Sequence, residues 1–163
     1  MMKSALLLVL ACIAQAAVAL GGQQTTLGRQ VMARPEAPSV ATTTHARATY
    51  VLHCAGCHGV DGAGLPQSYV PGLKRLGDFL RLAGGREFVI KVPGVMGSGL
   101  GDAQVAEVAN WVLGTIAKDS LPPQHTPYAA ADVARARAAP LVDVLAERRR
   151  LQEQARQQGL VIH

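Results

Sequence analysis

Aromatic side chains are scarce in this chain, where two Phe, three Tyr and one Trp make up 4% of the 163 residues. Charged residues are also few, at 17%, and the formal net charge of +5 is scattered along the sequence without an aromatic and basic stripe. Without such a stripe the chain lacks the usual signature of a nucleic-acid-binding protein, so we expect partners only among other proteins. With so few aromatic residues, a small domain has a small hydrophobic core and needs an additional stabilising group, such as a disulfide, a metal or a cofactor.

Cysteine and histidine are rare too, with three and five residues, yet three of them fall together in Cys54-Ala55-Gly56-Cys57-His58. Cys-x-x-Cys-His is the attachment signal for a c-type haem, in which two thiols add to the haem vinyl groups. The histidine then lies under the iron as its proximal ligand. We therefore expect one covalent haem c, held by Cys54, Cys57 and His58. This large apolar group would supply the additional core that the domain needs.

Three other interpretations of the two cysteines are possible. A zinc half-site would need a second Cys/His pair elsewhere, and a thioredoxin-like redox pair would need a strand-loop-helix setting. The sequence offers neither companion. A structural disulfide or an isolated metal site is the remaining alternative.

The first residues have the pattern of a secretory signal peptide. A basic start over 1–3 precedes an apolar run over 5–20, and the small residues 17–19 form a cleavage site ahead of a polar stretch. We predict a signal peptide over 1–19 and a mature chain that begins near Leu20. Covalent haem is added outside the cytoplasmic membrane in bacteria, so the export signal and the haem motif support one another and predict a periplasmic protein.

Two variants of this processing stay open. The sequence up to Cys12 resembles a lipoprotein processing site, although it lies early and the apolar run continues past it. An uncleaved anchor is also conceivable, but the run is at the short end for a membrane span and a cleavage site follows it. We favour Cys12 as a small apolar residue of a removed segment, and expect no membrane insertion of the mature chain.

The remaining length suits one small domain with extensions. Residues 20–44 contain Pro35 and Pro38 without sustained apolar periodicity, so they are predicted to be a flexible leader. The domain is predicted over 45–118. Its first helix has Ala46 and Tyr50 at helical spacing and delivers the cysteines.

Further along, an apolar pattern predicts a helix over 73–82, closed by two glycines. Residues 87–92 are short and β-branched and are predicted to be extended, ending at Pro93. Asp102 is a predicted N-cap for a helix that continues to Ile116, with Trp111 on its packing side. The predicted fold class is all-α.

Over residues 46–118 the chain resembles the small monohaem class I cytochromes c of bacteria. The resemblance depends on the stretches 54–66, 71–73, 100–106 and 110–112 and covers under half of the chain. It implies a cytochrome c-like helical fold around the haem. It also implies that the Pro66 carbonyl accepts the second N–H of His58, fixing the ring and making it a better donor to iron.

The sixth iron ligand implied by the resemblance is Met96, because the family places its axial thioether between the middle helices and the last one. Met96 is also the only Met after the haem motif. It departs from the family pattern, however, because no Pro stands beside it and only three residues separate it from Leu100. The alternatives are a Met that packs on the porphyrin, ligation by His125, or an open sixth position.

Residues 119–163 lie beyond the family domain. After a Pro-rich spacer, they predict a helix over 129–138 and a second helix from Leu141 onward. Nearby acidic residues balance the positive charge of arginines 148–150 on the second helix. We therefore favour a solvated arm, or one packed on the domain, over a docking patch.

Together these features predict a periplasmic electron carrier. It would pass single electrons from a dehydrogenase to an oxidase or another cytochrome, with the chemistry supplied by the haem. No acid-base pair or nucleophile constellation appears, so we do not expect an enzyme. Two alternatives stay open: a haem subunit of a larger periplasmic dehydrogenase or oxidase, and a ligand-binding haem sensor or enzyme if Met96 is not a ligand.

Overall fold

The computed structural model describes residues 40–65 and 70–162, and all structural statements below refer to these residues. The predicted signal peptide, Cys12, the leader up to residue 39 and Pro66 lie outside them. The described residues belong to one compact unit.

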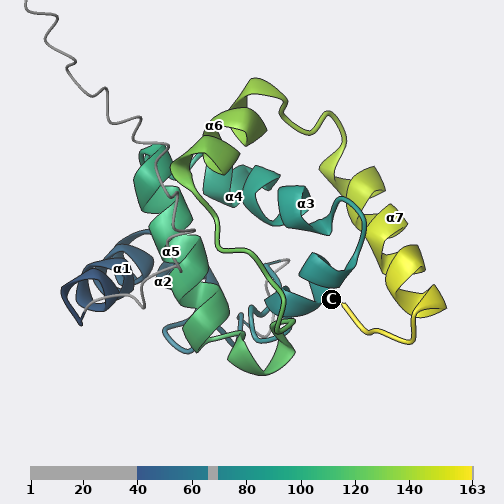
Figure 1. Cartoon of the computed structure of the whole chain (residues 1–163), viewed down its shortest axis with the longest axis horizontal. Helices are drawn as coiled ribbons and strands as arrows, with labels where there is room; N and C mark the ends of the chain where they lie inside the picture. Colours follow the sequence, from purple (N-terminus) through teal and green to yellow (C-terminus); the bar gives the residue numbers. More distant parts are fainter. Residues whose placement is uncertain (1–39, 66–69, 163) are drawn as a thin grey trace, which may run out of the picture. The chain divides into compact units, whose positions relative to one another are not determined.

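All regular secondary structure in the described residues is helical, which confirms the all-α prediction for this part of the chain (Figure 1). In chain order the elements are α1 (Val40–His53), α2 (Ala55–His58), η1 (Leu76–Arg81), α3 (Gly85–Lys91), α4 (Pro93–Met96), α5 (Asp102–Thr115), η2 (Lys118–Ser120), α6 (Ala130–Ala138) and α7 (Val144–Gln157).

Helix α1 packs against α5 and leads directly into the cysteine motif. Ala46, Thr49 and Tyr50 are buried at helical spacing, and the Tyr50 ring lies 5.2 Å from that of Trp111 on α5. The helix begins at Val40, so the last residues of the segment predicted to be leader, 40–44, are helical instead. Residues 42–45 are exposed, so this part of the helix carries no apolar pattern.

Residues 87–92 differ from the prediction, since 87–91 belong to helix α3 and are not extended. Phe88, Val89 and Ile90 are all buried, and the helical turn stacks the Phe88 ring on that of Phe79 at 5.5 Å. The β-branched residues favour a strand only weakly, and burial of this apolar run outweighs that preference.

Close backbone contact sets the start of α3. Gly84 has a left-handed φ of 81° at the N-cap, and a Cβ on Gly85 would collide with the Phe79 carbonyl oxygen. Glycine is therefore required at the turn between η1 and α3. The predicted helix over 73–82 is present only as the shorter 3₁₀ helix η1, Leu76–Arg81.

Helix α5 is present as predicted, but Gly101 and not Asp102 is its N-cap. The Gly101 N–H donates to Gln104 Oε1 at 3.0 Å, so a side chain from the first turn satisfies an amide that the helix leaves open. Asp102 is the first helical residue, where its carboxylate faces the positive end of the helix dipole.

The two helices predicted after residue 118 are confirmed as α6 and α7. Helix α6 packs on α5 and α3, while α7 packs on α3. The connection into α6 is fixed by Tyr128, whose hydroxyl donates to the Arg86 carbonyl at 2.7 Å and whose N–H donates to Asn110 Oδ1 at 2.8 Å. Residues 119–162 are therefore packed on the domain, which is one of the two arrangements that the sequence favoured.

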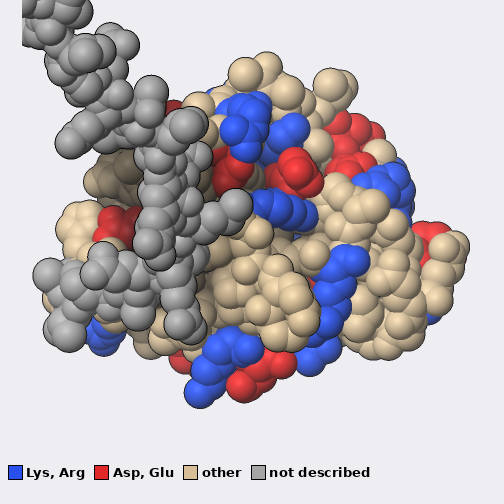
Figure 2. All heavy atoms as spheres, in the orientation of Figure 1, with Lys and Arg blue, Asp and Glu red and all other residues tan. Residues whose placement is uncertain are grey.

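Within the described residues, no helix has the length and apolar character needed to cross a membrane. Basic and acidic side chains are interspersed on the face of the molecule shown in Figure 2. Opposite charges also pair within single turns of α7, including Glu147 with Arg150 and Glu153 with Arg156.

Candidate functional site

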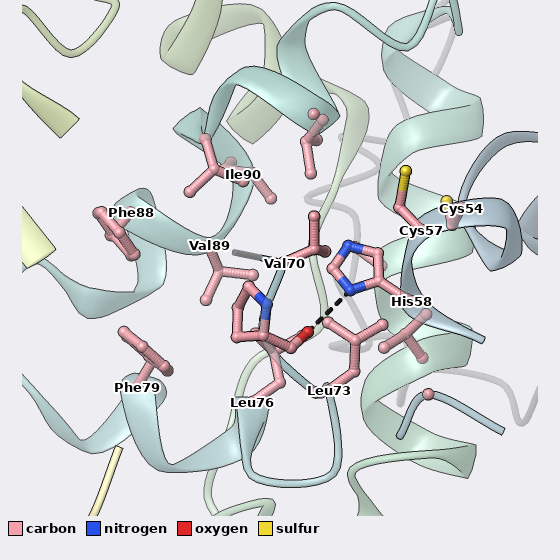
Figure 3. A pocket seen from close by; sticks show the side chains of 18 of the residues that line it. Cys54, Cys57, His58, Val70, Leu73, Leu76, Phe79, Phe88, Val89 and Ile90 are labelled. Carbon is pink, nitrogen blue, oxygen red and sulfur yellow. Dashed lines mark hydrogen bonds between the residues drawn. The ribbon is translucent and has the colours of Figure 1, made fainter. Parts of the chain in front are cut away.

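A cavity of about 650 Å³ lies beside the cysteine motif. Its volume falls within the roughly 300–1,000 Å³ typical of small-molecule sites. The lining comes from α1, α2, the loop before η1, η1 itself, and helices α3, α4, α5 and α7, and is mainly aliphatic and aromatic. Figure 3 shows Cys54, Cys57 and His58 opposite Phe79, Phe88 and Ile90.

The motif folds as a tight turn that gathers both thiols at the cavity. The N–H groups of Cys57 and His58 both donate to the Cys54 carbonyl, at 3.1 and 3.0 Å. Cys54 and Cys57 are free thiols and both line the cavity, so they are not joined in the disulfide that was one alternative. Burial, and secondarily the neighbouring Cys57, raise the pKa of the Cys54 thiol, which keeps it protonated at neutral pH.

His58 also lines the cavity, and one of its ring nitrogens is fixed by the backbone. Nδ1 lies 2.9 Å from the Pro71 carbonyl oxygen, drawn as a dashed line in Figure 3. A carbonyl only accepts hydrogen bonds, so Nδ1 carries the proton and Nε2 keeps its lone pair. His58 is thus held in the tautomer in which Nε2 is available to a metal.

The family resemblance implied Pro66 as the acceptor of this hydrogen bond. Pro66 lies outside the described residues, and among the described residues the Pro71 carbonyl is the acceptor. Two loop contacts bring Pro71 to the motif: Gly64 N–H donates to the His58 carbonyl at 2.8 Å, and Leu73 N–H donates to the Gly62 carbonyl at 2.7 Å.

Two glycines allow these loop segments to approach closely. A Cβ on Gly64, which has a φ of +78°, would lie 2.9 Å from the Gly72 nitrogen. A Cβ on Gly72 would lie 2.8 Å from the Ala63 carbonyl oxygen. Larger residues at either position would push the Pro71 carbonyl away from His58.

Tyr50 supports the motif from α1 and was assigned no functional role from the sequence. It is fully buried, and its hydroxyl donates to the Gly59 carbonyl at 2.6 Å. Burial, followed by the nearby Cys54 and Asp61, raises the pKa of Tyr50 to about 12. The phenol therefore remains a hydrogen-bond donor at neutral pH and ties α1 to the turn after His58.

The opposite wall of the cavity is apolar and comes from distant parts of the sequence. Phe79 and Phe88 stack against one another there. Val89 and Ile90 of α3 extend this wall. Val105, Val108 and Val112 line the cavity from α5, which packs on α1. An apolar lining of this kind offers few hydrogen bonds and favours an apolar ligand.

Met96 does not belong to this lining. It is the last residue of α4 and is partly buried against the core, whereas Val92 to Val95 line the cavity. His125, the other alternative ligand, lies in the loop between η2 and α6 and does not line the cavity either. The structure thus brings Cys54, Cys57 and His58 to the cavity, but neither Met96 nor His125.

The charged residues of the lining are all basic. Lys74, Arg75 and Arg148 contribute to it, and no Asp or Glu does so among the described residues. Lys74 Nζ lies 3.6 Å from Asp61 Oδ2, and Arg75 Nη2 lies 2.6 Å from Oδ2 of the buried Asp78. Sequence reasoning assigned Arg148 no role here, because nothing local in the sequence indicates that α7 reaches the cavity.

An apolar cavity with cationic residues suits a ligand that has a large apolar body and carboxylate groups. Within the described residues, no group of three or more His, Cys, Asp or Glu side chains is arranged to hold a bare metal ion. No family model matches the chain, and a search of curated proteins returned no match.

Proposed function

We propose that this protein is a c-type cytochrome that carries one covalently bound haem and passes single electrons between redox proteins of the periplasm. The observation that carries the proposal is the convergence of two free thiols and a histidine with an available Nε2 on one apolar cavity. The family resemblance over 46–118 adds the expectation of a cytochrome c-like fold.

The residues present fit a haem by their chemistry. Cys54 and Cys57 supply the two thioether attachments, and His58 supplies the proximal nitrogen to iron. The aliphatic and aromatic wall suits the macrocycle, while Lys74, Arg75 and Arg148 suit its two propionates. When bound, the haem supplies a one-electron couple between ferric and ferrous iron.

The role of the chain is then to fix geometry and polarity. The Pro71 carbonyl holds the His58 ring and increases its basicity toward iron. Tyr50 holds the turn that follows the motif. The apolar wall limits solvent access and so influences the redox potential. A carrier needs no further catalytic group, and its donor and acceptor would be a dehydrogenase and an oxidase or second cytochrome.

Covalent attachment is the first test. The protein would be produced in a bacterium that assembles c-type cytochromes and extracted with acidified acetone. We expect the colour to stay with the protein, and to be lost from the Cys54→Ala/Cys57→Ala double variant. Cys12→Ala is the matched control, since Cys12 is the remaining cysteine, and it should retain haem. Haem that partitions into the solvent from the wild type would contradict the proposal.

The position of Met96 favours a second candidate function. Val92 to Val95 line the cavity and Met96 does not, so a haem there would gain a sulfur ligand only if the Met96 side chain changed its position. An open sixth position would make the protein a ligand-binding haem sensor or enzyme and not a carrier.

Two variants at position 96 separate these functions. Met96→Leu keeps the side-chain volume and removes the sulfur, whereas Met96→Ala removes both. If Met96 is the distal ligand, the ferric wild type shows a weak near-infrared sulfur-to-iron band and excludes carbon monoxide when reduced, and both variants lose these properties. A wild type that lacks the band and binds carbon monoxide readily would support the sensor or enzyme.

A further inference from the structure

We propose that helix α7, from outside the region of family resemblance, closes the haem cavity and that the Arg148 guanidinium binds a haem propionate. This inference rests on the proposed function. It gives the C-terminal extension a defined role as part of the haem site.

One face of α7 is directed at the cavity. Val144, Leu145 and Arg148 all line it, and their spacing places them on adjacent turns of a single helix face. The helix is held in place by Leu151 and Ala155, which are buried in the core. These anchors hold α7 on the core, with Arg148 at the cavity.

The surroundings of Arg148 suit a carboxylate ligand. Its guanidinium carbon lies 5.9 Å from the centre of the Phe88 ring, which is part of the cavity wall. Burial lowers the pKa of this guanidinium, which indicates that it has lost part of its hydration. An anionic group in the cavity would offset that loss.

Lys74, Arg75 and Arg148 are the cations of the cavity lining. Lys74 and Arg75 come from the loop before η1, whereas Arg148 comes from α7. A planar guanidinium donates two parallel N–H groups to one carboxylate, which also orients it.

A cation at this position should raise the redox potential, because it disfavours the more positive ferric state. The test compares the holoproteins of the wild type, Arg148→Gln, Arg148→Lys and Arg149→Gln. Arg149 is the matched control, since it is the adjacent arginine, is exposed and does not line the cavity. Potentials would be measured by redox titration and propionate bonding by the propionate bending band in resonance Raman spectra.

We expect Arg148→Gln to lower the potential and shift the propionate band, while Arg149→Gln changes both much less. Arg148→Lys should retain most of the potential, because the charge remains, but should shift the band, because the bidentate geometry is lost. This second variant keeps the test decisive if Arg148→Gln folds poorly. Covalent haem with equal potentials and bands in Arg148→Gln and Arg149→Gln would overturn the role of Arg148 alone. Loss of covalent haem from the wild type would instead contradict the proposed function.

Discussion

The two walls of the cavity differ in how far apart their residues lie in the sequence. The attachment wall, defined as Cys54, Cys57 and His58 with their support from Tyr50 and Pro71, comes from one short stretch of chain. The opposite wall, defined as the lining residues of η1, α3, α4 and α7, is collected from residues 76–148.

The walls differ in chemistry as well. The attachment wall depends on particular atoms, two sulfurs and one imidazole nitrogen, which few substitutions can replace. The opposite wall depends on volume and apolar character, which many side chains supply. Substitutions of the two cysteines or of His58 should therefore change haem binding, and those of the apolar residues in the second wall should mainly change stability.

The largest expected effect on stability comes from breaking the opposite wall at Phe88. Phe88 is 2% exposed and stacks on Phe79, so Phe88→Ala should lower the free energy of unfolding by about 3–5 kcal/mol. Chemical denaturation of the holoprotein, followed by circular dichroism, measures the change. Val142→Ala is the control, because Val142 is fully exposed. A loss below about 1 kcal/mol for Phe88→Ala would show that this wall is not tightly packed.

A somewhat smaller effect is expected where α7 joins the same wall. Leu151 is fully buried on α7, and Leu151→Ala should lower the free energy of unfolding by about 2–4 kcal/mol. Haem should remain covalently attached, because the cysteines lie on the other wall. Hydrogen exchange of the α7 amides should become faster in this variant. Unchanged exchange would mean that α7 does not depend on Leu151 for its position.

The smallest of the three expected effects on stability comes from Tyr50 in the attachment wall. Tyr50→Phe keeps the ring but removes the hydroxyl that donates to the Gly59 carbonyl. Leaving that carbonyl without its donor should cost about 1–3 kcal/mol of unfolding free energy. Denaturation at neutral pH measures the cost, with Tyr128→Phe as a comparison at a second buried hydroxyl.

This last effect should also depend on pH in a defined direction. The folded pKa of Tyr50 is about 12, above its ordinary value of 10.0. Between these values the unfolded chain has released the phenolic proton and the folded chain has kept it, so folding stability falls as pH rises. The difference in stability between the wild type and Tyr50→Phe should therefore be full below pH 10 and shrink toward pH 12. A difference that stays constant across this range would contradict the raised pKa.

Part of the candidate site was predictable from the sequence because it is local. Cys54, Cys57 and His58 lie within one turn of chain, so their spacing alone brings them to the same place. Helix α5 was predictable for the same reason, since its apolar periodicity extends over several turns. The N-cap was misplaced by one residue because Gln104 supplies the capping contact to Gly101.

Other features required tertiary contacts. Residues 87–91 are helical because burial against Phe79 outweighs their β-branched preference. The Pro71 carbonyl reaches His58 because Gly64 and Gly72 let two loop segments approach closely. Arg148 reaches the cavity because α7 packs back on α3.

By itself, then, the sequence determined the all-α class of the described residues, the cysteine and histidine motif and the helices with long periodic patterns. Only the tertiary structure decided which carbonyl holds His58, that Met96 lies outside the cavity lining, and that the C-terminal extension forms part of the cavity. The physical reason is separation along the chain. Sequence spacing predicts the relative positions of residues only when they lie a few positions apart. Contacts between distant segments depend on how the whole core packs.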